Sequence, residues 1–223
     1  MSDEQVWNDQ TRRELRERLR SRILGELRLA KREHEEILQT CREVYIQDEC
    51  PARELDAFLQ FATDELERGE SLLASERVAW PEVTDCDRLD CVEEALRDKG
   101  ILLWQVSPCC DSCTGGELPD RIDVIDEHYP GFRDRLRGYA FFIDQNLPDI
   151  LADGTHVSVY LAYGWFSPDS SEVAANVYAE NALGIAREVC DSLRDEGFEA
   201  DWDGTLSRKI GISLNWQRRK MLE

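Results

Sequence analysis

The chain has 223 residues, of which 42% are hydrophobic and 33% are charged, and its formal net charge is −20 at pH 7. This composition is typical of a globular protein long enough to bury a hydrophobic core, and it argues against intrinsic disorder. The negative charge repels nucleic-acid phosphate and anionic lipid, so it argues against direct binding to either and favours a protein partner with a basic surface.

The sequence also predicts where the protein resides. No apolar run approaches the roughly 20 residues that a membrane span needs, and Met1-Ser-Asp-Glu-Gln5 lacks the basic and apolar regions of a signal peptide. We therefore expect a cytoplasmic protein without membrane contact. In that compartment the 8 cysteines are expected to be reduced thiols or metal ligands and not structural disulfides.

Two helices are predicted in the N-terminal third of the chain. Apolar or small residues recur at helical spacing through residues 4–47, which predicts one long helix with a single buried stripe. Cys50-Pro51 ends this pattern, because proline does not continue a helix interior, and a second amphipathic helix extends to about Leu73. Residues 1–79 are therefore predicted to form a helical hairpin arm that packs on the rest of the chain or on a second copy.

Residues 80–223 are predicted to form an α+β domain. Its expected helices are 85–99, 120–137 with an interruption at 129–131, and 170–196 with Ser170 as the cap; its expected strands are 101–106, 138–143, 156–163, 198–202 and 209–216. This order predicts an antiparallel sheet packed with helices, and it is compatible with a ferredoxin-like arrangement.

Chemically active side chains crowd at one place, Cys109-Cys110-Asp111-Ser112-Cys113. Two thiolates at this spacing can converge on one zinc ion, each at about 2.3 Å, and a tetrahedral site then needs further ligands. The helix before strand 101–106 is about as long as the strand itself, so the start of that helix should lie at the same end of the domain as the turn. The predicted zinc ligands are therefore Cys109, Cys110, Cys113 and Cys86, with Cys91 and His128 as alternatives to Cys86.

Two other interpretations of the cysteine turn remain open. The thiols can simply be packed in a tight turn, or they can take part in redox chemistry. Redox chemistry is favoured when a CxxC sequence lies at a helix N-terminus, where the dipole stabilises a thiolate. Thr114-Gly115-Gly116 is a poor start for a helix, which counts against this interpretation. The chain has no Gly-x-Ser-x-Gly and no His-Glu-x-x-His, so no catalytic residue is assigned.

From about Trp80 onward the chain resembles an uncharacterised bacterial family, one of the domains of unknown function. The resemblance is carried by the Cys109-Cys110-x-x-Cys113 turn, by Tyr160-Leu-Ala-Tyr-Gly164 and by Trp216-Gln-Arg-Arg219, and it covers roughly the last two-thirds of the chain. It implies a domain boundary near residue 80 and a shared cysteine turn. It brings no assigned activity.

The acidic charge and the absence of a catalytic motif make a non-enzymatic interaction protein the leading hypothesis. Such a protein would act as a regulatory or inhibitor-type domain on a partner with a basic surface, or it would form a homodimer. The alternative is a thiol- or zinc-dependent protein centred on Cys109–Cys113, with zinc as its cofactor.

Overall fold

The computed structural model describes residues 7–108, 110–167 and 173–222, and their contacts group them into two compact units. The helical unit comprises residues up to 82, then 146–155, then 216 onward, and the sheet unit comprises 83–145 and 156–215. The α+β class expected from the sequence is confirmed. The first border lies close to the expected boundary at residue 80, but two later segments of the chain return to the helical unit.

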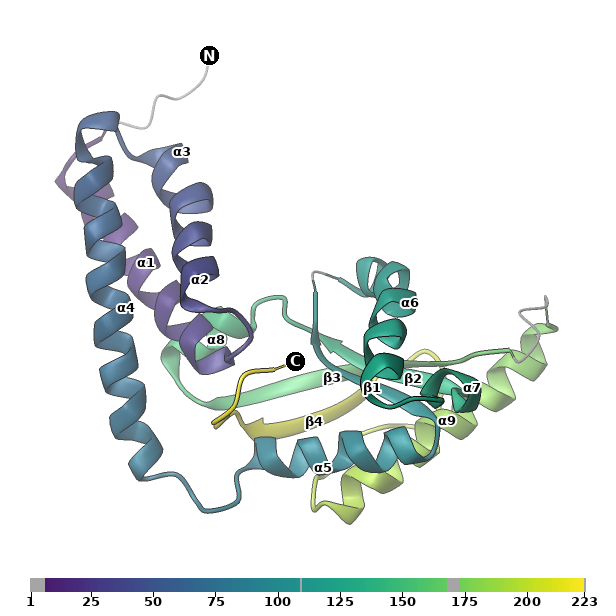
Figure 1. Cartoon of the computed structure of the whole chain (residues 1–223). Helices are drawn as coiled ribbons and strands as arrows, with labels where there is room; N and C mark the ends of the chain where they lie inside the picture. The colour runs from purple at the N-terminus through teal and green to yellow at the C-terminus, as the bar shows by residue number, and fades with distance from the viewer. Residues whose placement is uncertain (1–6, 109, 168–172, 223) are drawn as a thin grey trace. The chain divides into compact units, whose positions relative to one another are not determined.

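The helical unit contains more helices than the expected hairpin (Figure 1). Helix α1 (Asp9–Leu29) and helix α4 (Leu55–Val78) are joined by α2 (His34–Thr40), the π-helix η1 (Cys41–Ile46), α3 (Gln47–Glu49) and the 3-10 turn η2 (Ala52–Glu54). The prediction of one helix over 4–47 is wrong, because Ala30 adopts a left-handed conformation with φ 55° and ends α1. Apolar side chains from these helices form a common core, including Leu15, Leu19, Ile23, Ile37, Ile46, Phe58 and Leu66.

Two later segments complete the helical unit. Helix α8 (Leu147–Asp153), where the sequence indicated only a short connection, packs against α1. The approach is so close that a Cβ atom on Gly25 would lie 1.8 Å from the carbonyl oxygen of Pro148. Trp216 is fully buried, and its Nε1 donates a hydrogen bond to the carbonyl oxygen of Leu29 at 3.2 Å.

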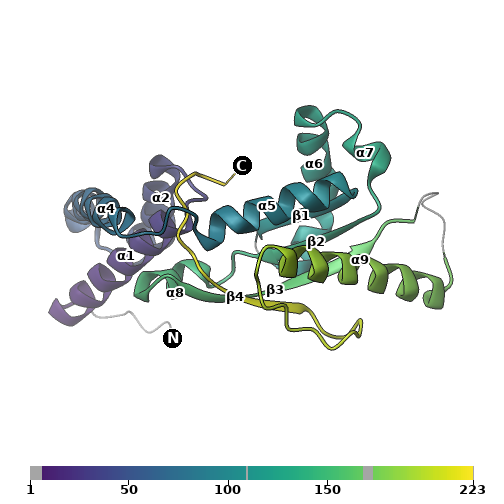
Figure 2. The same cartoon turned by 90° about the horizontal axis from the view of Figure 1, so that it is seen from below.

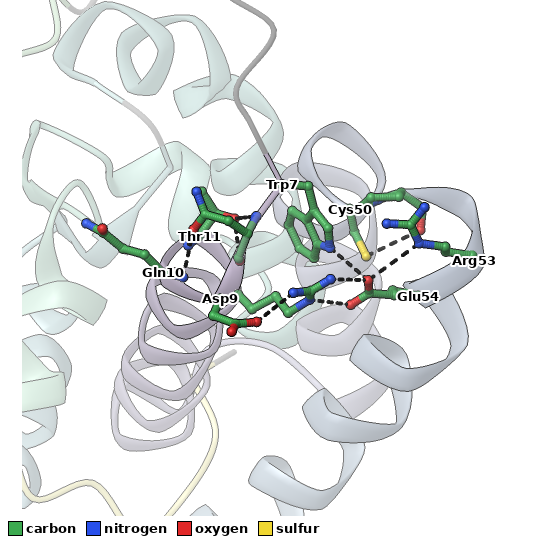
Figure 3. A network of polar contacts seen from close by, with 10 residues as sticks. Trp7, Asp9, Gln10, Thr11, Cys50, Arg53 and Glu54 are labelled. Carbon is green, nitrogen blue, oxygen red and sulfur yellow. Dashed lines mark hydrogen bonds and ion pairs between the residues drawn. The ribbon is translucent and has the colours of Figure 1, made fainter.

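A polar clamp joins the start of α1 to the start of α4 (Figure 3). Arg12 donates from Nε and Nη2 to the two carboxylate oxygens of Glu54, at 2.8 and 2.7 Å, and Trp7 Nε1 donates to the same carboxylate at 2.9 Å. These hydrogen bonds, the one from Arg12 foremost, lower the pKa of Glu54 to about 2.

The sheet unit contains four strands in sequential order: β1 (Ile101–Ser107), β2 (Gly138–Ile143), β3 (His156–Trp165) and β4 (Ile210–Asn215). Strands β1 and β2 are parallel and the other pairs are antiparallel, so the sheet is mixed and not purely antiparallel. Because β1 and β2 lie side by side, their βαβ unit is not split by another strand as a ferredoxin-like arrangement requires. The strand expected at 198–202 is reduced to one bridge between Asp201 and Gly211.

Helices cover the two faces of the sheet unequally (Figure 1, Figure 2). Helices α5 (Asp85–Asp98) and α9 (Ala175–Asp195) pack on one face. Helices α6 (Asp111–His128) and α7 (Phe132–Arg135) cover β1 and β2 on the other. Over β3 that second face is open, and 61% of the Tyr160 surface is exposed there. The expected cap Ser170 lies outside the described residues.

Among the described residues, no helix is both long enough and apolar enough to cross a membrane. In the sheet unit the strand that matters most for chemistry is β1. Its C-terminal end carries the cysteine turn, which continues directly into α6.

Candidate functional site

The backbone is strained where β1 leaves the sheet. Val106 has φ 53° although it is β-branched and almost fully buried, a conformation that L-residues with a branched Cβ rarely adopt. The pairing register with β2 shifts between Trp104 and Ser107, at the same place. Such strain persists only where surrounding contacts impose it, and it is concentrated at functional sites.

Hydrogen bonds join three elements around this strained end. Ser107 Oγ donates to the carbonyl oxygen of Phe142 at 3.2 Å, and the Asp144 amide donates to the Ser107 carbonyl at 2.9 Å, which connects the ends of β1 and β2. Thr114, in the first turn of α6, places its Oγ1 3.0 Å from Ser107 Oγ and 3.1 Å from the Pro108 carbonyl. Ser107 and Thr114 are completely buried. Their hydroxyl groups are hydrogen-bonded within the protein, which makes the backbone on both sides of the cysteine turn rigid.

The cysteine turn is the N-terminus of α6. Cys110 is the N-cap residue with extended backbone angles, Cys113 lies in the first helical turn, and their Sγ atoms are 3.5 Å apart. Thr114-Gly115-Gly116 was expected to be a poor start for a helix, and that expectation is wrong, because α6 includes these residues. Each glycine costs about 1 kcal/mol in a helix interior. The helix forms because its later residues Leu118, Ile122 and Ile125 bury an apolar face with Leu102 of β1.

Asp111, which stands between the two cysteines in the sequence, takes part in an ion pair. Lys209, which immediately precedes β4, places Nζ 2.8 Å from Oδ1 and 2.7 Å from Oδ2 of Asp111. A carboxylate next to a thiol opposes its ionisation, and a neighbouring ammonium group offsets that effect. Lys209 is therefore a residue of this site that the sequence did not indicate. It is separated from the turn by about 100 positions in the chain, and only the folded sheet brings the two together.

Four thiols outside the turn are poorly suited to ionise. Burial raises the pKa of Cys41 to about 11 and also raises the pKa values of Cys50 and Cys190. Cys91 is exposed, but partial desolvation and then nearby carboxylates, Glu196 first among them, raise its pKa as well. These four cysteines are therefore expected to be slow nucleophiles near neutral pH.

The predicted zinc ligands are only partly placed. Cys110 and Cys113 lie together, Cys86 is 1% exposed in the first turn of α5, and Cys109 lies outside the described residues. His128 ends α6, so at about 1.5 Å per residue it lies about 22 Å from Cys113 and cannot share a metal with it. Over the described ranges no cluster of three or more His, Cys, Asp or Glu side chains is arranged to hold a metal ion. Zinc binding that includes Cys109 or Cys86 stays a prediction.

A groove of about 530 Å³ lies on the β4 side of the sheet unit. It is lined by β3 and β4 and by the segment 197–201, with Arg88 and Tyr160 among its walls. Gly211 belongs to this lining and is two residues from Lys209. The sheet unit therefore has a groove beside β4, the strand that Lys209 immediately precedes.

Comparison with known proteins identifies one family model that matches residues 12–220, described as a domain of unknown function (DUF6891). No curated protein and no solved structure matches the chain. The matched range includes residues of both compact units.

Proposed function

The chain belongs to the DUF6891 family, and from the geometry of the cysteine turn we propose that it is a thiol–disulfide exchange protein whose reacting groups are Cys110 and Cys113. The observation that carries this proposal is a CxxC sequence at the N-terminus of α6, with the two sulfur atoms 3.5 Å apart. Amide groups at a helix N-terminus lack intrahelical partners and favour negative charge, which is the condition that makes a thiol nucleophilic.

The exchange uses two thiols and one disulfide. The Cys110 thiolate attacks one sulfur of a partner's disulfide, which forms a mixed disulfide and releases the partner's other sulfur as a thiolate. The Cys113 thiolate then attacks Cys110 Sγ, releases the partner's second thiolate and leaves a disulfide between the two cysteines. The two protons lost by Cys110 and Cys113 pass to the partner's thiolates. Two electrons are transferred, and the reverse sequence oxidises a dithiol.

The distance between the sulfur atoms suits this cycle. A disulfide has an S–S length of about 2.05 Å, so Cys110 and Cys113 must approach each other by about 1.5 Å to form one. Cys110 is half-buried and Cys113 is exposed, so a partner can reach the pair. The buried hydroxyl groups of Ser107 and Thr114 hold the backbone on either side of the turn, which favours formation of the disulfide without unfolding of α6.

A redox titration tests the proposal directly. The purified protein is equilibrated in reduced and oxidised glutathione mixtures, and the Cys110–Cys113 disulfide is quantified by mass spectrometry. We expect one two-electron transition, abolished in Cys110→Ser and Cys113→Ser and unchanged in the matched control Cys91→Ser. Cys113→Ser should instead accumulate glutathione on Cys110. Absence of the disulfide across the whole range of mixtures would refute the function.

Zinc ligation is a competing use of the same thiols. Metal analysis of protein purified without chelator distinguishes the two, because a thiolate held by zinc is protected from glutathione and alkylating reagents. Stoichiometric zinc, lost in Cys110→Ser and Cys113→Ser, would favour a metal site. Metal-free protein with reactive thiols would favour exchange.

We retain protein binding as a second candidate function because one observation favours it. Residues 80–223 carry 14 basic and 28 acidic side chains, a net charge of −14, and the open face over β3 exposes Tyr160. An acidic surface with an exposed aromatic side chain suits a partner with a basic surface. Capture of such a partner at low salt, weakened by moderate salt and by Tyr160→Ala, supports this function. Equal capture by Tyr160→Ala would contradict the role of this face.

A further inference from the structure

The groove of the sheet unit lies along the outer edge of β4. This strand is the last in the sheet, so β3 pairs with only one of its two edges. The groove is lined by Gly211, Ile212 and Ser213 of β4 and by the segment 197–201, and all of its lining residues belong to the sheet unit. An edge strand presents main-chain N–H and C=O groups that can pair with another chain.

Two sets of hydrogen bonds identify the residues of β4 that point to this outer edge. Gly211 and Asp201 exchange both of their main-chain hydrogen bonds, each at 2.9 Å, and the Asn215 amide donates to Oδ2 of Asp85 at 2.7 Å. Alternate residues of a strand direct their main-chain groups to the same edge. Ser213 stands midway between Gly211 and Asn215, so its N–H and C=O also point outward.

The outward main-chain groups of Ser213 are available to a ligand. Over the described ranges, no hydrogen bond to either group is found on this side, and Ser213 is exposed. Its side-chain Oγ lies 2.8 Å from Ser158 Oγ of β3, so it is directed elsewhere. At about 3.4 Å per residue the edge spans about 13 Å from Gly211 to Asn215. About three residues of an extended chain therefore fit along it.

The segment that would otherwise cover this edge does not pair with it. Antiparallel pairing continued from the single bridge to Gly211 would place Glu199 opposite Ser213. The pairing stops at the bridge because the neighbouring Phe198 is buried and its amide donates to a carbonyl of α9 at 2.9 Å. These contacts keep the segment from continuing as a strand, and a groove of about 530 Å³ is left beside β4.

The groove has a local negative charge. Its lining contains three carboxylates, those of Asp85, Glu199 and Asp201, and one guanidinium group, that of Arg88. Asp85 forms an ion pair with Arg88, and Asp201 forms one with Arg208. Glu199 is exposed, and no ion pair within the described part of the chain involves it. The groove therefore favours a cationic group close to Glu199.

We propose that an extended segment of a basic partner protein adds to β4 as a further strand in this groove. Its main chain accepts a hydrogen bond from the Ser213 N–H and donates one to the Ser213 carbonyl, and a Lys or Arg side chain contacts Glu199. In this mode of recognition the main-chain hydrogen bonds supply affinity and the side chains supply specificity. The inference rests on protein binding, the second candidate function above, and does not depend on thiol exchange.

The charge of the groove also distinguishes a basic segment from a second copy of this chain. Two copies paired along β4 would bring their carboxylates together across the new interface, and like charges placed opposite each other oppose association. A basic segment has the complementary charge. It is therefore the occupant that the groove favours.

A nuclear magnetic resonance titration of the ¹⁵N-labelled full-length protein tests the proposal with synthetic peptides. The probe is an acetylated and amidated pentapeptide of alternating valine and lysine. One comparison peptide has glutamate in place of lysine, and the other is the lysine peptide N-methylated at its three central residues. We expect saturable binding of the lysine peptide, hydrogen exchange of the Ser213 amide slowed at least tenfold at saturation, and binding of both comparison peptides at least fivefold weaker.

Protein variants locate the binding. Ser213→Pro removes an N–H that points away from β3, a change that edge strands tolerate, and it should weaken the lysine peptide at least fivefold. Ser158→Ala removes the same hydroxyl contact without changing the main chain of β4, so it should change binding less than twofold. Glu199→Gln should weaken binding about two- to threefold, whereas Glu67→Gln, an exposed control on α4, should not.

Circular dichroism and thermal unfolding establish that each variant is folded, and the N-methylated peptide tests the main-chain pairing on the unaltered protein. No saturable binding of the lysine peptide, equal binding of its N-methylated form, or unchanged binding in folded Ser213→Pro would each overturn the proposal. Self-association that Ser213→Pro abolishes would overturn it in favour of a second copy. Capture of a basic partner that depends on Tyr160 and is unchanged in Ser213→Pro would overturn strand addition and leave protein binding in place.

Discussion

At the scale of single residues, two exposed cysteines of the sheet unit differ in the groups that surround their thiols. Cys91 and Cys113 have the same side chain and both are exposed. Cys91 is exposed on α5, where partial desolvation and then the nearby carboxylates raise its pKa. Cys113 lies in the first turn of α6, with its sulfur 3.5 Å from the Cys110 sulfur, and Asp111 of the same turn pairs with Lys209.

We therefore predict selective alkylation. At pH 7 iodoacetamide should modify Cys110 or Cys113 at least tenfold faster than Cys91, because a raised pKa leaves less thiolate at a given pH. As pH rises, Cys91 should approach the rate of the turn, and Cys41, with a pKa of about 11 and no exposure, should react last. Peptide mass spectrometry over a time course measures each rate. Equal rates for Cys91 and the turn at pH 7 would contradict the proposed activation.

Lys209 is predicted to act as a positioning residue for the thiols. Lys209→Gln leaves the Asp111 carboxylate unneutralised beside them, so alkylation of the turn at pH 7 should slow about two- to fivefold. The dependence of the rate on pH should also move to higher pH. Lys220→Gln, which changes the same charge at an exposed position, is the matched control and should leave the rate unchanged. A slower rate without a shift in the pH profile would indicate a merely structural effect.

At the scale of elements, helix packing rests on a few close contacts. Gly25 of α1 faces the carbonyl of Pro148 in α8, and an added Cβ has no space there. Gly25→Ala should therefore lower the free energy of unfolding by about 1–3 kcal/mol through overpacking. Gly184, inside α9, has nothing within 4 Å of the position of its Cβ, so Gly184→Ala should be neutral or stabilising by up to about 1 kcal/mol. Urea denaturation measures the free energy of unfolding of both variants. Equal changes in the two variants would contradict the prediction.

The clamp between α1 and α4 gives the helical unit a pH dependence. The pKa of Glu54 falls from 4.5 to about 2 on folding. Its contribution to stability is therefore complete above pH 4.5 and is lost as pH falls through 2. Glu54→Gln removes this dependence, whereas Glu67→Gln, an exposed residue of α4, should retain it. Urea denaturation between pH 5 and pH 2 compares the three proteins, and identical profiles for wild type and Glu54→Gln would rule out the clamp as the cause.

At the scale of the whole molecule, the helical unit depends on parts of the chain that are distant in sequence. A fragment of residues 1–82 lacks α8 and the buried Trp216, whose indole contacts Leu29. We expect this fragment to keep helical circular dichroism, bind a hydrophobic dye and lose cooperative unfolding, because its core is incompletely covered. Addition of residues 146–155 and 216–223 through a linker should restore cooperativity. Cooperative unfolding of the 1–82 fragment would show that the later segments are dispensable.

Local patterns in the sequence predicted much of the architecture. Helix α5, strands β1, β2, β3 and β4, and the break at Cys50-Pro51 follow from residue periodicity and proline. These signals are local and depend on neighbours along the chain. The spacing of Cys110 and Cys113 likewise identified them as candidate site residues. The left-handed turn at Ala30 is not, because alanine normally continues a helix.

The sequence alone determined an acidic α+β protein with a CxxC sequence directly after a buried strand. Only the tertiary structure decided that this CxxC begins a helix, that Lys209 pairs with Asp111 inside it, and that Arg77 and Arg219 both lie near the Trp80 ring. The physical reason is the same in each case. These outcomes depend on burial and charge contributed by residues far away in the chain, and local propensity does not contain that information.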